Sequence, residues 1–327
     1  MKRFAPLMVA TALLLSVALT GCTQTGTSDR LKVVSTIFPQ YDWVRQILGD
    51  NAENVELTLL LDRGIDMHSY QPTVDDIFRI SSCDLFIYVG GESDGWVQDA
   101  LIEASNPEMV VINMLEVLGD AAQLEEIVEG VQDDHDHEDD EHPPDDHGIA
   151  YDEHVWLSLK NAQILCAVIT DALSSLDAPN AELYRNNLAS YTQKLSVLDA
   201  KYRDMVNAAP VKTLLFGDRF PFLYLVKDYG LQYYPAFPGC STETRATFGL
   251  IISLVETVDK LGLKTILVTE SSDGRIAQTI ISESKDKNQQ ILVLDSIQSV
   301  GYSEMENGAT YLTLMAHNLD ILEEALR

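Results

Sequence analysis

The sequence has little cysteine and little positive charge. Its 327 residues include 4 cysteines, and 22 lysine and arginine residues stand against 51 aspartate and glutamate residues, for a formal net charge of −29. Because no two cysteines have the C-x-x-C spacing, we do not expect a thiolate metal site. A chain this acidic does not bind nucleic acid or anionic lipid through its charge, so cations are its natural partners.

The H-E-x-x-H spacing of a zinc protease is also missing. We therefore expect a binding protein and not an enzyme. A zinc-dependent hydrolase, with two histidines and one carboxylate around an open coordination position, is the less favoured alternative.

A long apolar run lies at the N-terminus. Lys2 and Arg3 precede residues 7–19, a run typical of a signal peptide and short for a membrane span. The following Leu19-Thr20-Gly21-Cys22 resembles the bacterial lipobox, which implies that Cys22 is lipidated. We expect a signal peptide over residues 1–22, a tether over 23–30, and an exported protein anchored by lipid to a bacterial membrane, facing the periplasm or exterior. The alternative is an ordinary secretory signal with a chance cysteine.

Apolar runs alternate with helical patterns through the rest of the chain, which predicts parallel sheets with helices on both faces. The sequence is therefore of the α/β class. The predicted strands are 31–37, 55–61, 84–90 and 109–115, then 213–217, 231–237, 265–270 and 291–296. They fall into two sets of four, so we expect two four-stranded lobes over residues 31–179 and 210–327.

One long helix is expected to join the lobes. Residues 180–208 contain neither glycine nor proline, and apolar side chains from Leu183 to Tyr202 recur at helical steps. Pro179 and Pro210 flank this stretch, as expected at helix ends. A helix over 180–209 would span about 40 Å, enough to run along both lobes.

The N-terminal lobe contains an acidic segment, residues 132–148, that is expected to be a mobile loop because it buries too little to offset its ordering entropy. Two interpretations are open, a solvated linker or a metal-collecting loop. We favour metal contact because short histidine-rich tracts are typical of metal binding. The segment holds four of the seven histidines of the chain: His135, His137, His142 and His147.

Polar residues at the ends of the predicted strands form a candidate metal site, because ligands bind beyond the carboxyl ends of strands in α/β sheets. His68, His154 and Asp295 lie in such loops of the two lobes, and imidazole with carboxylate suits zinc. Asp218 is a further candidate. Glu270 also ends a strand, although such a carboxylate more often caps or pairs locally.

Four motifs at these positions resemble the zinc- and manganese-specific solute-binding proteins of ABC transporters, the ZnuA- and TroA-like family. GIDMHSYQPT (64–73) looks like G-x-D-P-H-x-Y-x-P-T, and DEHVWLSL (152–159) like D-P-H-x-W-L-S-P. LVLDSI (292–297) resembles the family's aspartate-bearing strand end, and TYLTLMAHNLDIL (310–322) its closing helix. The similarity runs from about residue 31 to the end.

The resemblance implies a monomeric receptor that captures a divalent metal between its lobes and delivers it to an ABC transporter permease. Histidine-rich acidic loops occur in the zinc-preferring members, so Zn²⁺ is the expected cargo and Mn²⁺ the alternative. Relatives have also been described as surface adhesins, an activity that would be secondary here.

The sequence departs from the family pattern at three places. Proline is replaced before both motif histidines, by Met67 and Glu153, which we expect to alter loop stiffness and not ligation. The family's third ligand falls on Arg219, which cannot ligate because it stays protonated. Asp218, a loop histidine or water could complete the site, or Arg219 could pair with a carboxylate of a changed site. Cys240 is interpreted as a turn residue or half of a disulfide.

Overall fold

Two parallel four-stranded sheets form the framework of the protein. The computed structural model describes residues 30–62, 64–125, 150–240 and 246–327, and residues 31–327 form one compact unit. The first sheet has the order β2-β1-β3-β4 and the second β6-β5-β7-β8, with every pairing parallel. The strands are β1 (Leu31–Ser35), β2 (Val55–Leu59), β3 (Leu85–Tyr88), β4 (Val110–Asn113), β5 (Thr213–Phe220), β6 (Gln232–Pro238), β7 (Thr265–Val268) and β8 (Gln290–Val293).

All eight predicted strands are confirmed, although most end earlier than expected. The predicted strand 109–115 stops at Asn113, whose side chain accepts the backbone N–H of Glu116 and so caps the following helix. The helices are α1 (Phe38–Leu48), α2 (Val74–Ser81), α3 (Val97–Ile102), α4 (Met114–Leu118), α5 (Leu159–Leu176), α6 (Ala181–Ala208), α7 (Leu223–Tyr229), α8 (Phe248–Leu261), α9 (Arg275–Glu283), α10 (Tyr302–Glu306) and α11 (Tyr311–Ala325). Short 3₁₀ turns include η2 (Met67–Ser69) and η4 (Val155–Leu157).

Helices cover both faces of the second sheet, as alternation along its strands requires. Leu214 and Phe216 of β5 enter the large core that includes residues of α11, whereas Leu215 between them enters a smaller core beneath α8 and α9. Successive side chains of a strand point to opposite faces. The two-sided α/β architecture expected from the sequence is therefore confirmed.

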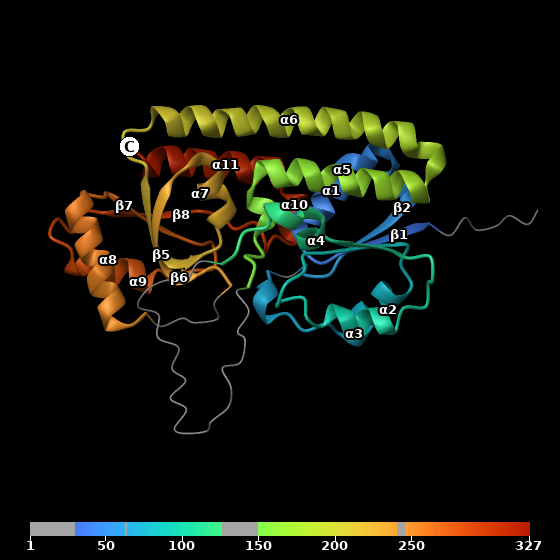
Figure 1. Ribbon diagram of the computed structural model, residues 1–327, viewed down its shortest axis with the longest axis horizontal. Helices are drawn as coiled ribbons and strands as arrows, with labels where there is room; N and C mark the ends of the chain where they lie inside the picture. Colours follow the sequence, from blue (N-terminus) through green and yellow to red (C-terminus); the bar gives the residue numbers. More distant parts are fainter. Residues whose placement is uncertain (1–29, 63, 126–149, 241–245) are drawn as a thin grey trace, which may run out of the picture. The chain divides into compact units, whose positions relative to one another are not determined.

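The long helix α6 runs along both lobes (Figure 1). It packs on α1 and α5 of the first lobe and on α7 and α11 of the second. Its 28 residues give a length of about 42 Å. The predicted apolar face is confirmed at Tyr191, Leu195 and Tyr202, which are buried, but it is wrong at its start, because Leu183 is 38% exposed and the neighbouring Tyr184 is buried instead.

The two lobes share one hydrophobic core. At its centre lie Trp43 and Trp156 of the first lobe and Tyr311 of the second, which we call the interlobe joint. The Trp43 and Tyr311 rings meet edge to face at 5.2 Å, and the Trp156 indole N–H donates to the Ser296 carbonyl at 2.8 Å. All three side chains are fully buried. The predicted lobe boundaries at residues 179 and 210 stay a prediction.

Among the described residues, no helix combines the length and the apolar character needed to cross a membrane.

Leu195→Ala should lower the free energy of unfolding by about 2–5 kcal/mol, because the side chain is fully buried against the shared core. Leu183→Ala, the same change on the same helix, should cost less than about 1 kcal/mol because that side chain is partly exposed. Urea denaturation of both variants measures the difference. Equal losses of unfolding free energy would contradict the observed orientation of α6, in which Leu195 faces the core and Leu183 does not.

Candidate metal centre

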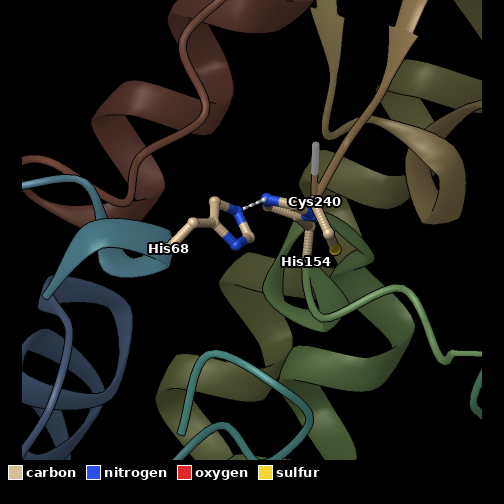
Figure 2. Close-up of side chains that lie close together, drawn as sticks. All are labelled: His68, His154 and Cys240. Carbon is tan, nitrogen blue, oxygen red and sulfur yellow. Dashed lines mark hydrogen bonds between the residues drawn. The ribbon is translucent and has the colours of Figure 1, made fainter. Parts of the chain in front are cut away.

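Three potential metal ligands from different parts of the chain meet between the lobes (Figure 2). The ligand atoms of His68, His154 and Cys240 all lie within 4.8 Å of one another. Among the described residues, no other group of three or more histidine, cysteine or acidic side chains lies close enough together to hold one ion. His68 belongs to η2 after β2, His154 immediately precedes η4, and Cys240 follows β6.

His154 is fixed from behind by an aspartate. Asp152 accepts the backbone N–H of His154 at 2.8 Å, and the same oxygen lies 3.1 Å from Nδ1 of the ring. Both residues are at most 1% exposed. A carboxylate at Nδ1 holds the proton there, so the Nε2 lone pair is free to face a metal ion.

His68 is held in the same manner by two groups. Its Nδ1 lies 2.8 Å from Ser93 Oγ and 3.5 Å from Glu153 Oε2. The other oxygen of Glu153 accepts the Ser93 backbone N–H at 2.9 Å, while Oε2 is buried with no hydrogen bond. Glu153 replaces the proline of the motif that this segment resembles, and it places a carboxylate behind a predicted ligand. The expected effect on loop stiffness stays a prediction.

The two rings point their Nε2 atoms at each other, 3.2 Å apart (Figure 2). Two zinc–nitrogen bonds of about 2.0–2.1 Å at a tetrahedral angle separate their nitrogens by about 3.3 Å. With both Nδ1 atoms facing acceptors, the two Nε2 lone pairs would repel unless a proton or a cation lies between them. The arrangement therefore fits either one shared proton or one metal ion.

The protonation of the pair follows from its surroundings. Burial, reinforced by the charge of His154, lowers the pKa of His68 to about 3. Burial also acts to lower the pKa of His154, but the neighbouring carboxylates, Asp152 first among them, outweigh it and raise that pKa above the ordinary value of 6.5. Without metal, the shared proton belongs to His154, and a metal ion must displace it.

Arg219 pairs with a carboxylate of the opposite lobe, one of the alternatives left open by the sequence. Its guanidinium donates to Asp66 at 2.6 Å, and the other oxygen of Asp66 accepts the backbone N–H of His68 at 3.1 Å. Burial acts to raise the pKa of Asp66, but Arg219 outweighs it and lowers that pKa. Arg219 therefore ties the His68 turn to β5.

Asp218 lies at a bulge in β5, outside the cluster of His68, His154 and Cys240, and ligation by it stays a prediction. The register against β6 shifts between Phe216 and Arg219, which inserts one extra residue. Asp218 accepts the N–H and hydroxyl of Thr269 at 3.1 and 2.6 Å. Gly217 beside it lies where an added Cβ would come within 2.8 Å of Ala277, so only glycine fits the bulge. Asp218 is thus held within its own lobe.

Glu270 and Asp295 lie close to each other at the ends of β7 and β8, outside the three-residue cluster. Both oxygens of Glu270 accept hydrogen bonds from Ser296, at 2.9 and 2.6 Å, which is the local pairing named as its alternative. Asp295 accepts the N–H of Ile297 at 2.7 Å. Burial raises the pKa of both carboxyls, and the charge of Asp295 raises that of Glu270 further. Ligation by Asp295 stays a prediction.

Sequence reasoning missed two residues of this centre. Cys240 follows β6, and the rule applied to the other strand ends would have found it. Ser93 lies in the turn Gly91–Gly95, which reads G-E-S-D-G and therefore has the G-x-S-x-G spacing of a serine hydrolase. Ser93 lacks the positive φ of a strained nucleophile elbow, and its hydroxyl instead orients His68.

The predicted loop histidines His135, His137, His142 and His147, together with the lipidation site Cys22, lie outside the described residues.

Comparison with known proteins relates the chain to zinc uptake. The family model ZnuA, described as the periplasmic component A of a zinc-uptake complex, matches residues 33–325. The chain is 30% identical over 330 residues to the high-affinity zinc uptake system protein ZnuA of Bacillus subtilis, covering 99% of this chain and 98% of that protein. It is 28% identical over 311 residues to zinc-binding protein AdcA of Streptococcus pyogenes serotype M3, covering 93% of this chain and 58% of AdcA.

The fold is likewise similar to a zinc-bound structure. The crystal structure of the Zn(II)-bound ZnuA-like domain of Streptococcus pneumoniae AdcA matches with a TM-score of 0.68 and 25% sequence identity, over 91% of this chain and 99% of that domain. The chain thus spans little more than half of the AdcA proteins, over a part that resembles one of their domains.

Asp152→Asn should weaken binding of a divalent ion such as zinc by about 10–100-fold, because it removes the charge that holds the His154 tautomer. Asp199→Asn, at a similarly hydrogen-bonded aspartate on α6, is the matched control and should leave affinity unchanged. Isothermal titration calorimetry measures both variants. Unchanged affinity in Asp152→Asn would contradict the assigned role of this carboxylate.

Proposed function

The chain belongs to the ZnuA family of zinc-uptake components, and we propose that it captures a zinc ion between its two lobes and delivers it to an ABC importer. The observation that carries the proposal is the pair of imidazoles with Nε2 atoms 3.2 Å apart and both Nδ1 atoms backed by acceptors. Such a pair is prepared to exchange a proton for a metal ion.

Zinc is favoured over manganese as the cargo by the donors that meet here. Imidazole suits zinc, whereas manganese prefers oxygen-rich octahedral surroundings. The carboxylates beside the histidines, Asp152 and Glu153, lie behind the rings, at their Nδ1 atoms. They supply negative charge that attracts any divalent cation, while the ring nitrogens discriminate.

The wider setting of the receptor belongs to the same proposal. Export, lipid attachment at Cys22, a monomeric state and delivery to a permease together describe a tethered receptor that hands its cargo to a membrane partner. The four histidines of segment 132–148 would collect zinc with lower affinity. A receptor of this kind binds its zinc ion stoichiometrically and catalyses no reaction. A zinc hydrolase would instead turn over ester or peptide substrates.

The double variant His68→Ala/His154→Ala should lose tight zinc binding, because both ring nitrogens are removed. Zinc at about 100 times its Kd should stabilise the unaltered protein by about 2.7 kcal/mol, and this gain should vanish in the variant. Calorimetry and thermal unfolding with and without zinc measure the two effects. His317→Ala, at an exposed histidine of α11, is the control and should behave like the unaltered protein. Tight binding retained in the double variant would refute the proposed site.

Zinc affinity should fall as the pH is lowered. The ion competes with the proton on His154, whose pKa is raised above 6.5, so affinity should drop at least about tenfold per pH unit below that pKa. Binding below the pKa of His154 should release a proton, which calorimetry in buffers of different ionisation enthalpy detects. An affinity independent of pH between 5 and 8, with no proton released, would contradict this exchange.

A further inference from the structure

Both histidines of the cluster come from the first lobe, and its one donor from the second lobe is a thiol. We propose that Cys240 is the third zinc ligand and takes the place that Arg219 cannot fill. The inference rests on the proposed function and deepens it, because it assigns the ligand through which the second lobe grips the cargo. The ion would then be bound by two nitrogens and one sulfur.

The position of Cys240 is built by close contacts and not by a free loop. An added Cβ on Gly239 would come within 2.7 Å of the Phe220 carbonyl oxygen and 3.2 Å of the His154 ring, so the turn lies directly against the imidazole. The Cys240 backbone N–H donates to the carboxylate of Glu125 at 2.9 Å. The turn is therefore held from both lobes, with the Cys240 sulfur within 4.8 Å of a ligand nitrogen of each histidine (Figure 2).

The distances permit one tetrahedral ion. A zinc–sulfur bond of about 2.3 Å and a zinc–nitrogen bond of about 2.0–2.1 Å place the two donors about 3.5 Å apart. The three donor atoms lie within 4.8 Å of one another, so a shift of about 1 Å in the turn closes the site. On binding, the thiol proton leaves to solvent as the sulfur–zinc bond forms, and a fourth position stays open for water or Asp295.

The charges around the cluster suit a thiolate only when the metal is present. Burial of the Cys240 sulfur, and then the charges of Asp152, Glu153 and Glu125, raise the pKa of the thiol and so disfavour a thiolate. A divalent cation reverses that balance, because a coordinating thiol is deprotonated outright by the metal. The same acids then offset the charge of the ion. The thiolate would therefore form only as the metal ion binds.

A thiolate also sharpens the choice of metal. Soft sulfur ligands favour zinc, whereas manganese is held by carboxylate, carbonyl and water oxygens. Two histidines alone discriminate less strongly than two histidines with a sulfur. Cys240 would therefore supply much of the preference for zinc over manganese.

The test is a Co²⁺ and Zn²⁺ titration of the purified, reduced protein beside Cys240→Ser, which is nearly isosteric. Cobalt bound by a thiolate gives a near-ultraviolet sulfur-to-cobalt charge-transfer band, which a merely structural role would not produce. We expect the band in the unaltered protein and not in Cys240→Ser. Zinc Kd should rise by at least about 100-fold in Cys240→Ser, the upper end of what loss of a mere supporting partner costs.

Two further variants and one unfolding measurement separate loss of a zinc ligand from loss of any cysteine and from loss of stability. Cys83→Ala removes a buried thiol outside the cluster and should keep both the band and the affinity. Cys240→Asp offers oxygen in place of sulfur and should narrow the preference for zinc over manganese. Metal-free thermal unfolding of Cys240→Ser should match that of the unaltered protein.

The outcomes distinguish this inference from the function on which it rests. Tight zinc binding that depends on His68 and His154, without a charge-transfer band and with unchanged affinity in Cys240→Ser, overturns the inference and leaves the receptor function standing. Absence of tight zinc binding in the unaltered protein overturns both. A band that disappears in Cys240→Ser, together with weakened zinc binding, supports both.

Discussion

The hydrophobic contact between the two lobes is the constraint on which the candidate site depends. Trp43 and Tyr311 meet across the lobes, and Trp156, two residues after His154, donates to the carbonyl beside Asp295. These side chains are fully buried, so the edges of the two sheets are held at a set distance. Because close-packed interiors transmit strain and resist compression, the spacing of donors from opposite lobes follows from this packing. Helix α6 packs on helices of both lobes and so further restricts their movement relative to each other.

The candidate metal centre departs from the rules that the core obeys. It buries two imidazoles with their Nε2 atoms 3.2 Å apart, leaves Oε2 of Glu153 without a hydrogen bond, and places acids near a thiol. Each feature is unfavourable without a cation, and one divalent ion bound there would offset all of them together. Such local conflicts in an otherwise consistent structure are expected at functional sites.

The sequence predicted the parts of this molecule that depend on local pattern. Apolar runs predicted all eight strands, and the rule that ligands follow strand ends selected His68 and His154. The sequence could not predict the hydrogen bonds of Asp218, because a bulge in β5 leaves no pattern in the sequence. The bulge exchanges the sides of the sheet to which the following side chains point. Cys240 follows β6 and so meets the same strand-end rule, but its proximity to His154 comes from a turn packed against the other lobe, which the sequence does not show. Leu183 was misplaced because a buried tyrosine next to it takes the inner face of α6.

The bulge in β5 has a consequence for how a protein of this fold can change. Side chains alternate along a strand with a period of two, so one inserted residue exchanges the inward and outward positions beyond it. Next to the extra residue, Asp218 accepts a hydrogen bond from Thr269, and Arg219 pairs with Asp66 of the opposite lobe. The gain or loss of a single codon at this point could therefore exchange a ligand for a salt bridge while the core stays intact. The chemistry that one lobe presents to the other can thus change in one genetic step, without a new fold.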